Sequence, residues 1–353
     1  MIVSSMDALA TTDLPVVSIV IAARNEASSI ERCIDALRQQ DYPPTRLEIL
    51  VADGRSADDT RTIVNRIASV DPRVRLVDNP TRTTPAAFNA GLQLATGSVL
   101  GIMSGHAEAS PDYVIRSVAA LRDTAAWAVG GRIVREASTP SQEAIARVTS
   151  SPFGVGDSKH NYADEPGFVE TVFPGMWPRA TLTRVGIFDT ELQRNQDDDL
   201  SFRIREAGGT IWYDPAIRVR YQPRGTLRAL FRQYRQYGSW KVRVYQKHPR
   251  AVRPRQLVPA VWVGTLVGGT LLGFLTPIAW VAASAAAVSY MGLMLAASHR
   301  MAGGDVGRAR LVVTFLALHA GYGIGMWMGA VRFAPRWLIG RRGAPEILRV
   351  STV

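Results

Sequence analysis

Three polar stretches directly follow apolar runs in the first third of the chain, and their residue types could bind a charged ligand. They are "AARNEASS" from Ala22, "DGRS" from Asp53 and "SGHAE" from Ser104. Carboxylates in such positions can hold a ribose, the edge of a uracil, or a metal ion that carries a diphosphate. An imidazole such as that of His106 can bind a metal ion through a neutral ring nitrogen.

A fourth stretch, "NQDDDLSFRIREAGG", places three acidic residues at the start of a predicted helix. Asn195 is in position to cap this helix, Leu200 and Ile204 fall on its apolar face, and Gly208 ends it. A carboxylate that points into a site from a helix N-terminus can act as general base towards a hydroxyl group. The alternative is that the three acids only complement the helix dipole.

Apolar runs and helical patterns alternate along the chain and must position these groups. The near-continuous apolar run "PVVSIVIAA" and the run "SVLGIMS" predict buried strands, and "LEILVAD" and "VRLVDN" predict two further strands between them. A helical stripe follows the first run, formed by Ile30, Cys33, Ile34 and Leu37. Strands that alternate with helices predict an α/β fold with a parallel sheet and helices on both faces. Ligands bind beyond the carboxyl ends of such strands, which is where the polar stretches lie.

The first strand does not lead into a glycine-rich phosphate loop. It is followed by "AARNEASS", and no GxxxxGK[ST] pattern is present, so the redox and NTPase interpretations are weakened. Cys33 is the only cysteine, which excludes an internal disulfide, and its place on an apolar helix face predicts a core thiol. Without a second clustered His or Cys, a structural zinc site is not expected.

The charge of the chain is divided unevenly. The net charge is +11 over 353 residues, yet 20 basic and only 2 acidic residues follow Asp214, against 21 and 28 in residues 1–214. This asymmetry suggests that the second part meets a membrane or a nucleic acid. Segment 223–256 combines a helical apolar stripe with cations just before an apolar region, which favours an interfacial helix on anionic lipid over nucleic-acid binding.

The apolar region 257–331 predicts about three transmembrane helices. Leu257–Ser298 carries no charge and is long enough for two crossings of roughly 20 residues, with a turn near Thr276–Pro277. Leu311–Val331 fits one more crossing. The alternative is a buried helical hairpin of a soluble protein.

The basic segments beside these helices do not agree on one topology. The positive-inside rule favours the cytoplasm for His299–Arg310 and also for Arg332–Arg342, but the two segments flank a single predicted span. Either the third apolar segment is re-entrant, or the basic C-terminal tail, 332–353, lies outside.

Four motifs, taken in order, carry a resemblance to a known family. With "VSIVIAARNE", "ILVADGRSADDT", "NAGLQLATG" and "NQDDDLSFRIREAGGTIWYDP", the chain from Val16 to Tyr245 resembles a family-2 glycosyltransferase with the GT-A fold. The similar branch builds succinoglycan-type exopolysaccharides and carries C-terminal membrane segments. The resemblance implies a GT-A catalytic domain at 16–222, with a Rossmann-like mixed or parallel sheet. The preceding tail, 1–15, has no secretory signal pattern, so we expect a multi-pass protein of the cytoplasmic membrane with its catalytic domain facing the cytoplasm.

The resemblance assigns the donor side of the site to the strand ends. Asp53 would bind the base or ribose of a nucleotide-diphosphate sugar, with UDP-sugars as the first choice. Ala23 and Glu26 would line the same pocket. The alternative for Asp53 is that its carboxylate only caps the turn that follows.

The turn "SGH" stands where the family usually has Asp-x-Asp and where this branch has Asp-Gly-His. Gly105 allows the backbone to pass close to the donor, and the Ser104 hydroxyl can hydrogen-bond a ribose or a metal-bound water. His106 would bind a divalent ion, Mn²⁺ in preference to Mg²⁺, because magnesium prefers oxygen ligands. Glu108 is a candidate partner of His106. The alternative is that His106 hydrogen-bonds a phosphate without a metal.

The acid cluster would serve the acceptor side. Asp197 matches the acid that acts as base in the family, whereas Gln196 departs from the family's Glu. Asp198 is expected on the acceptor side and is the next candidate for the base. Trp177, in "FPGMWPRATLTRVGIFD", either stacks on a sugar ring or belongs to the core.

The activity implied by the resemblance is inverting transfer of a sugar to a hydroxyl of a lipid-linked or polysaccharide acceptor. The partners would then be the sugar donor, the acceptor and membrane lipids, and no nucleic acid is expected. One alternative is a polyprenyl-phosphate sugar synthase, whose phosphate acceptor needs little base catalysis. Another is a non-catalytic sugar-nucleotide sensor of a membrane assembly, which the departures at Ser104 and Gln196 keep open.

Overall fold

The computed structural model describes residues 14–156, 158–339 and 347–351, and the expected tail 1–15 lies almost wholly outside them. The chain forms two compact units that do not follow the order of the sequence. Of the described residues, the sheet unit comprises 14–134, 163–221 and 347–351, and the helical unit comprises 135–156, 158–162 and 222–339. The predicted domain 16–222 is therefore interrupted by a segment that packs with the helical unit.

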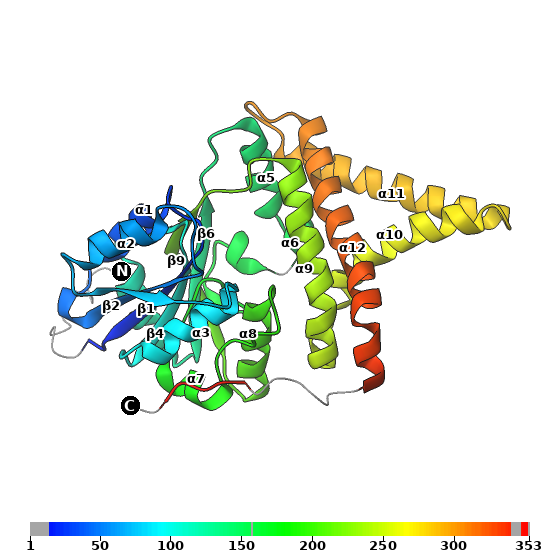
Figure 1. The fold of residues 1–353 in the computed structure, drawn as a ribbon. Coiled ribbons are helices and arrows are strands. Elements are labelled where there is room, and N and C mark those ends of the chain that lie inside the picture. The colour runs from blue at the N-terminus through cyan, green and yellow to red at the C-terminus, as the bar shows by residue number, and fades with distance from the viewer. Residues whose placement is uncertain (1–13, 157, 340–346, 352–353) are drawn as a thin grey trace. The chain divides into compact units, whose positions relative to one another are not determined.

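A mixed sheet forms the centre of the sheet unit (Figure 1). In the described part of the chain its strand order is β3-β2-β1-β4-β8-β6-β9-β5, with β7 paired to β9. Strands β1 to β4 are parallel, whereas β8 is antiparallel to β4 and β6, and β9 is antiparallel to β5 and β7. The strands are β1 Val17–Ala23, β2 Leu47–Asp53, β3 Val74–Asp78, β4 Val99–Ser104, β5 Ala107–Ala109, β6 Ala128–Arg135, β7 Gly167–Phe168, β8 Gly175–Pro178 and β9 Ile211–Tyr221.

Parallel pairing brings the carboxyl ends of the first strands to one level. Ala23 pairs with Asp53, Asp53 pairs with Asp78, and Ala22 pairs with Ser104. The four predicted strands are confirmed. Strands β1, β2 and β4 are buried almost throughout, as apolar runs inside a sheet are, whereas β3 at the sheet edge exposes Arg75 and Asp78.

Helices cover both faces of the sheet, as predicted. One apolar cluster joins the sheet to α1, α2 and α4, and a second joins it to α3, α7 and α8. The predicted stripe on α1, which includes Cys33, is fully buried. These helices are α1 Ile30–Arg38, α2 Thr60–Ala68, α3 Thr84–Leu94, α4 Tyr113–Thr124, α7 Arg179–Val185 and α8 Gln196–Glu206.

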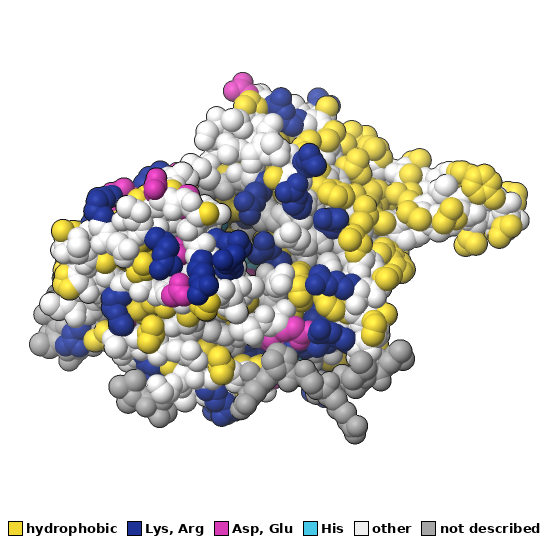
Figure 2. Space-filling model, viewed as in Figure 1, with side chains coloured by type: hydrophobic (Ala, Val, Ile, Leu, Met, Phe, Trp, Pro, Cys, Tyr) yellow, Lys and Arg dark blue, Asp and Glu magenta, His cyan; other side chains and the backbone are white. Residues whose placement is uncertain are grey.

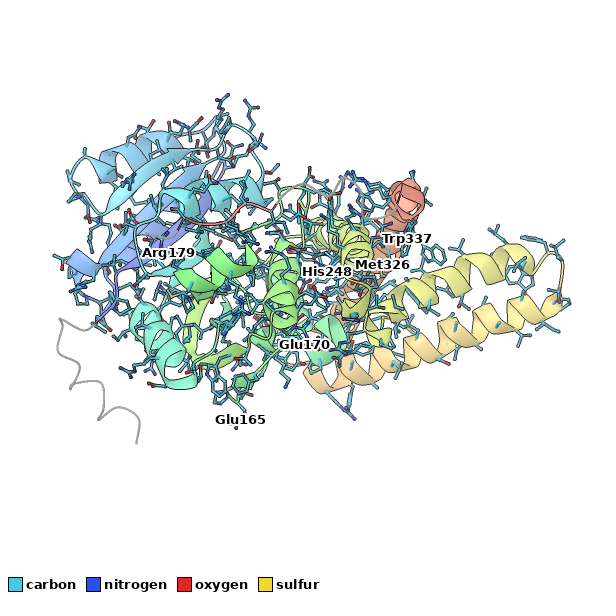
Figure 3. The ribbon with its side chains drawn as sticks, turned by 90° about the horizontal axis from the view of Figure 1, so that it is seen from below. Glu165, Glu170, Arg179, His248, Met326 and Trp337 are labelled. Atoms are coloured by element: carbon cyan, nitrogen blue, oxygen red, sulfur yellow. The ribbon has the colours of Figure 1, made fainter. Side chains whose placement is uncertain are left out.

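Arg179, labelled in Figure 3, is a buried cation that fastens the end of α3 to the start of α7. Its Nε atom donates to the carbonyl of Gly97 at 2.9 Å and one terminal nitrogen donates to the carbonyl of Ala95 at 2.6 Å. Desolvation lowers the pKa of Arg179. A cation at a helix C-terminus satisfies carbonyls that have no partner within the helix.

The helical unit contains an antiparallel pair, α10 and α11, that projects beyond the other helices of the unit (Figure 1). The predicted turn is confirmed, because α10 ends at Leu272 and α11 begins at Pro277. Figure 2 shows apolar side chains along this pair. Among the described helices, two rather than the expected three, α11 and α12, are long and apolar enough to cross a membrane. The helices of this unit are α5 Pro140–Thr149, α6 Pro152–Val155, α9 Leu227–Lys247, α10 Pro254–Leu272, α11 Pro277–Met301 and α12 Arg308–Ile339.

Candidate functional site

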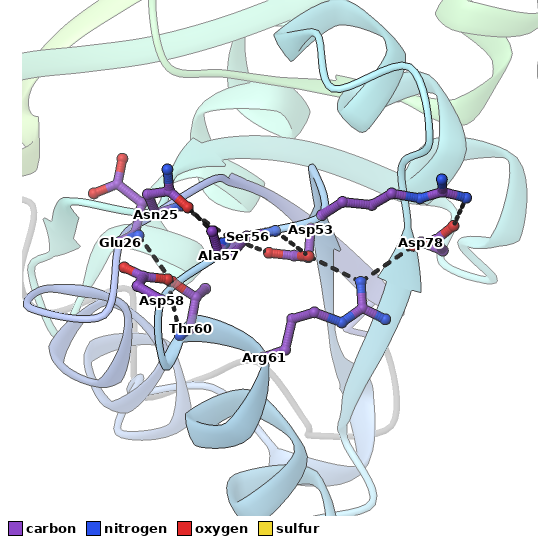
Figure 4. A network of polar contacts seen from close by, with 10 residues as sticks. Asn25, Glu26, Asp53, Ser56, Ala57, Asp58, Thr60, Arg61 and Asp78 are labelled. Atoms are coloured by element: carbon purple, nitrogen blue, oxygen red, sulfur yellow. Dashed lines mark hydrogen bonds and ion pairs between the residues drawn. The ribbon is translucent and has the colours of Figure 1, made fainter.

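The loops that follow β1 and β2 are tied together by reciprocal hydrogen bonds (Figure 4). The backbone N–H of Asn25 donates to the Ser56 hydroxyl at 2.9 Å, and the Asn25 side-chain oxygen accepts from the N–H of Ala57 at 2.9 Å. The N–H of Glu26 donates to the Thr60 hydroxyl at 2.8 Å. The two loops therefore form one preorganised edge at the carboxyl ends of the strands.

Asp53 is the buried anchor of this edge. Its side chain is 0% exposed and accepts hydrogen bonds from the hydroxyl and the N–H of Ser56, as the capping alternative requires. Arg61 donates to Asp53 at 2.9 Å and to Asp78 at 3.1 Å, and the bond to Asp53 is the main reason why the pKa of Arg61 is raised. Arg61 is partly exposed, so the guanidinium that pairs with the buried Asp53 carboxylate is itself accessible to solvent.

Three of the loops at this edge contain a non-glycine residue in the left-handed backbone region. The φ values are 56° at Asn25, 53° at Arg55 and 60° at Arg82, which follow β1, β2 and β3 respectively. Such conformations cost of order 1–3 kcal/mol each, and they concentrate at functional sites. The side chains of these loops are thus held in place by backbone geometry as well as by hydrogen bonds.

His106 lies just beyond β4 and pairs with Glu26. The distance between Nδ1 of His106 and Oε1 of Glu26 is 2.8 Å, and the Ser29 hydroxyl donates to the Glu26 carboxylate at 3.0 Å. The edge of the His106 ring contacts Tyr221 at the end of β9, with the ring centroids 5.3 Å apart. Glu26 thereby takes the position beside His106 that the sequence suggested for Glu108.

Glu108 is used elsewhere in the sheet unit. Its two carboxylate oxygens form ion pairs with Arg32 at 3.0 Å and with Arg220 at 3.1 Å. The turn itself is tight: a Cβ atom on Gly105 would lie 3.2 Å from Cγ of Glu26 and 3.3 Å from Cβ of Ala23. Gly105 therefore permits close packing of the turn on β1, and Ser104 stands half-buried at the end of β4.

The residues around His106 can contribute to a metal site but cannot enclose an ion. Within the described ranges, no group of three or more His, Cys, Asp or Glu side chains could hold a metal by itself. However, a carboxylate hydrogen-bonded to one imidazole nitrogen is the usual support for a histidine that binds metal through the other. An ion held by one or two protein groups and completed by phosphate oxygens matches these residues.

The acid cluster begins α8, as predicted. Asn195 occupies the N-cap position with a φ of 59°, although its side chain makes no capping hydrogen bond, and Leu200 and Ile204 are buried in the core. Asp199 is 1% exposed and forms an ion pair with Arg203 at 2.9 Å. Asp199 therefore has a structural partner inside the fold, whereas the side chains of the two preceding acids are partly exposed.

Two other predicted residues are buried. Trp177 is 4% exposed, its ring meets Phe188 edge-on at 6.1 Å, and it belongs to the apolar core rather than to a sugar-facing surface. Gln196 is 8% exposed, and its side-chain oxygen makes no hydrogen bond within the described part of the chain.

The sequence did not predict the roles of Asp58, Thr60 and Arg61, whose side chains hydrogen-bond to the residues at the strand ends. Arg61 gives no signal of its own, because a cation one residue into a helix is common on protein surfaces. The roles of Asp58 and Thr60 could have been predicted more readily. The Asp58 carboxylate accepts from the Thr60 hydroxyl and from the N–H of Ala27, the latter at 3.0 Å, and the pKa of Asp58 is lowered, chiefly by Thr60. A cluster of Asp and Thr before a helix is a known capping signal.

Comparison with known proteins identifies relatives that match most of the chain. Residues 18–190 match the model of glycosyl transferase family 2. The succinoglycan biosynthesis protein ExoA of Rhizobium meliloti is 32% identical over 308 residues, which cover 86% of this chain and 93% of that protein. A dolichyl N-acetyl-α-D-glucosaminyl phosphate 3-β-D-2,3-diacetamido-2,3-dideoxy-β-D-glucuronosyltransferase of Methanococcus voltae is 28% identical over 64% of this chain and 72% of its own length.

A solved structure has the same fold. The mannosyltransferase PcManGT from Pyrobaculum calidifontis, solved in complex with GDP-Man and Mn²⁺, superimposes with a TM-score of 0.53. The two chains share 24% sequence identity, and the match covers 93% of this chain and 88% of the other. The expected GT-A fold is thereby confirmed.

Proposed function

Because the chain belongs to glycosyl transferase family 2, we propose that it is an inverting, membrane-associated transferase. It would move a sugar from a nucleotide-diphosphate donor to a hydroxyl group of a lipid-linked or polysaccharide acceptor. The observation that carries this proposal is the shared edge of β1, β2 and β4, where the pairs Asp53–Arg61 and Glu26–His106 stand at the carboxyl ends of adjacent strands.

The donor side follows from these two pairs. The Asp53–Arg61 pair and the rigid loops around it would hold the nucleoside, and His106, oriented by Glu26, would face the diphosphate together with Ser104. A divalent ion bound at His106 would supply positive charge against the charge that develops on the departing diphosphate. We favour Mn²⁺ over Mg²⁺ because of the imidazole ligand.

On the acceptor side, Asp197 would remove the proton from the acceptor hydroxyl as its oxygen attacks the anomeric carbon. The bond between that carbon and the diphosphate breaks on the opposite side, which inverts the configuration. The first turn of α8 suits this role, since the helix dipole stabilises a carboxylate there. Asp198 is the second candidate.

The relatives support a lipid-linked or polysaccharide acceptor. One is named for succinoglycan biosynthesis, and the name of the archaeal relative describes transfer to a dolichyl-linked sugar phosphate. Membership of the family favours an enzyme over a sugar-nucleotide sensor. A polyprenyl-phosphate sugar synthase remains the second candidate, because apolar C-terminal helices suit either lipid acceptor.

A ligand screen followed by a transfer assay tests the proposal. The full-length protein in detergent is heated with a panel of UDP- and GDP-sugars, each with Mn²⁺ or with chelator, and the true donor should raise the unfolding temperature by mass action. That donor is then offered with polyprenyl phosphate or with a polyprenyl-diphosphate-linked sugar. Transfer only to the linked sugar supports a hydroxyl acceptor, transfer to the bare phosphate supports the synthase, and a lack of any stabilising donor contradicts both.

A further inference from the structure

The last described residues of the chain, 347–351, are part of the sheet unit. The carbonyl of Leu348 accepts from the N–H of Ile187 at 2.8 Å, and the carbonyl of Val350 accepts from the Thr183 hydroxyl at 3.3 Å. The Val350 side chain is 2% exposed and lies in the core cluster of α3, α7 and α8. The segment also depends on a glycine, because a Cβ on Gly186 would lie 2.5 Å from the Ile347 side chain.

This docking restricts how the chain can pass through a bilayer. The chain leaves the sheet unit after Tyr221 and has returned to it by Ile347. A folded unit lies on one side of a membrane, so the intervening residues must cross it an even number of times or not at all. Three crossings would place the C-terminal segment on the opposite side from the core that it completes.

The α10–α11 hairpin has the surface of a lipid-embedded element. By length and composition alone α12 and not α10 resembles a spanning helix, but burial reverses this order. No residue of α10 is buried, and only 17% of the most apolar stretch of α11 is buried, against 50% for α12. The chain carries no charge from Leu257 to Ser298, including the turn between the helices. Large apolar side chains that are more than half exposed line both helices and the turn: Val258, Val261, Val267, Leu271, Leu272, Phe274, Leu275, Ile278, Val281, Val288 and Leu293.

Helix α12, in contrast, is in backbone contact with the basic helix α9. A Cβ on Gly325 would lie 2.1 Å from the carbonyl oxygen of Arg235, and a Cβ on Gly329 would lie 2.4 Å from that of Ser239. A glycine of α9 approaches α12 in the same way, because a Cβ on Gly238 would lie 2.1 Å from the carbonyl oxygen of Tyr322. Met326 of α12, labelled in Figure 3, packs with Val242 and Tyr245 of α9.

This pairing makes α12 a poor transmembrane helix. The helix beside it carries cations along its length: Arg228, Arg232, Arg235, Lys241, Arg243 and Lys247. A cation at the centre of a bilayer costs about 2.5–3.5 kcal/mol even on insertion scales, so α9 cannot follow α12 into hydrocarbon. Of these cations, Arg228, Arg232, Arg235 and Lys247 are exposed or partly exposed and suit contact with anionic headgroups at the membrane surface, whereas Lys241 and Arg243 are buried.

The distribution of basic residues is consistent with insertion of the hairpin alone. Arg253 and Arg255 stand at the base of α10, and His299 and Arg300 at the base of α11. If α12 does not cross the membrane, the basic segments His299–Arg310 and Arg332–Arg342 both lie on the side from which the α10–α11 hairpin enters. Both then satisfy the positive-inside rule, which three crossings cannot achieve.

We propose that the α10–α11 hairpin is the only part of the described chain that enters the bilayer core. It enters from the side of the sheet unit and returns to that side, while α9 and α12 remain at the membrane surface against anionic lipid. This inference rests on the membrane association proposed above, and it is independent of which sugar is transferred.

Single cysteines report the side of each segment, because the natural Cys33 is buried and burial raises the pKa of its thiol. The variants are Asp305→Cys between α11 and α12, Ser351→Cys in the C-terminal segment, and Arg122→Cys on the exposed face of α4. Each full-length protein is placed in sealed membrane vesicles and treated with a membrane-impermeant maleimide, before and after permeabilisation with a non-denaturing detergent. If Arg122→Cys reacts in sealed vesicles, the sheet unit lies on the outer side of those vesicles, and this preparation is used for the other two variants.

We expect Asp305→Cys and Ser351→Cys to react in the same sealed vesicles as Arg122→Cys, with the wild type as the unreactive background. Protection of Ser351→Cys alone would indicate three crossings, and protection of Asp305→Cys alone would indicate that α11 and α12 cross instead. Either result overturns the proposal. Carbonate washing of the membranes is the independent check: release of the wild type would show that the membrane association itself is wrong.

Discussion

Nδ1 of His106 lies 2.8 Å from Oε1 of Glu26, so a residue that follows β4 is oriented by one that follows β1. The pair exists because β1 and β4 are adjacent and parallel, with Ala22 opposite Ser104. A hydrogen bond at Nδ1 directs the other ring nitrogen, Nε2, away from Glu26, which is the arrangement that suits a ligand on the far side of the ring.

Replacing Glu26 by Ala should weaken Mn²⁺-dependent donor binding by about 10- to 100-fold, the usual effect of removing the group that orients a metal-binding histidine. His106→Ala should abolish the dependence on Mn²⁺. Donor binding is measured by calorimetry with and without chelator, and Glu108→Ala is the matched control, because Glu108 pairs with arginines instead. An equal loss with and without Mn²⁺ would mean that Glu26 acts on the donor directly.

Asp197→Asn should reduce sugar transfer by about 10²- to 10⁴-fold while donor affinity stays near that of the wild type, because an amide cannot accept the acceptor's proton. Transfer rate and donor affinity are measured on the same preparation. Asp198→Asn is the neighbouring control. If Asp197→Asn retains transfer and Asp198→Asn loses it, the base is Asp198.

Arg61→Met should destabilise the fold by about 1–3 kcal/mol, because the carboxylate of Asp53 would remain buried with one partner fewer. Urea unfolding of Arg61→Met, Asp53→Asn and the double variant gives the coupling between the two side chains, which we expect at about 0.5–3 kcal/mol. Arg55→Met, which removes an exposed cation, should change stability by less than about 0.5 kcal/mol. Simple additivity of the two changes would show that the pair is not a structural unit.

The stability of the sheet unit should fall in acid in a way that depends on Asp71. Arg73, with Arg38, holds the pKa of the Asp71 carboxyl well below its usual range, against the effect of burial. A carboxyl whose pKa is depressed by folding stabilises the protein above its unfolded pKa of about 3.9, and this stabilisation is lost as the pH falls through the lower folded pKa.

The comparison with Asp71→Asn isolates this contribution. The difference in unfolding free energy between the wild type and the variant should be constant above about pH 5 and should shrink below about pH 4. Urea unfolding at a series of pH values measures it. If this difference stays constant down to pH 3, Asp71 does not contribute to the loss of stability in acid.

Val350→Ala should destabilise the sheet unit by about 1–3 kcal/mol, because the deletion leaves a cavity in the apolar core that Val350 shares with α3, α7 and α8. Leu348→Ala is the control two residues away, since its side chain is 47% exposed and contributes mainly through its backbone carbonyl. Thermal unfolding of both variants compares the two sites. Equal stability of Val350→Ala and the wild type would show that the C-terminal segment does not complete the core.

The sequence by itself determined the local elements. The four predicted strand segments became β1 to β4, and the stripe that includes Ile30 and Cys33 became the buried face of α1. These elements are readable because buried strands and amphipathic helices depend on the period of apolar residues in a short window. The rule that ligands bind at strand ends then selected Glu26, Asp53 and the turn at Ser104 without knowledge of contacts.

Only the tertiary structure decided which side chains meet. Glu26 rather than Glu108 faces His106, because strand order places β4 beside β1, whereas Glu108 lies on β5 opposite Arg220 of β9. Trp177 is buried because β8 joins the sheet beside β4, a pairing between segments far apart in the chain. The docking of Val350 into the core is equally remote in sequence. Such contacts depend on long-range packing, which leaves no periodic signal in the residues that make them.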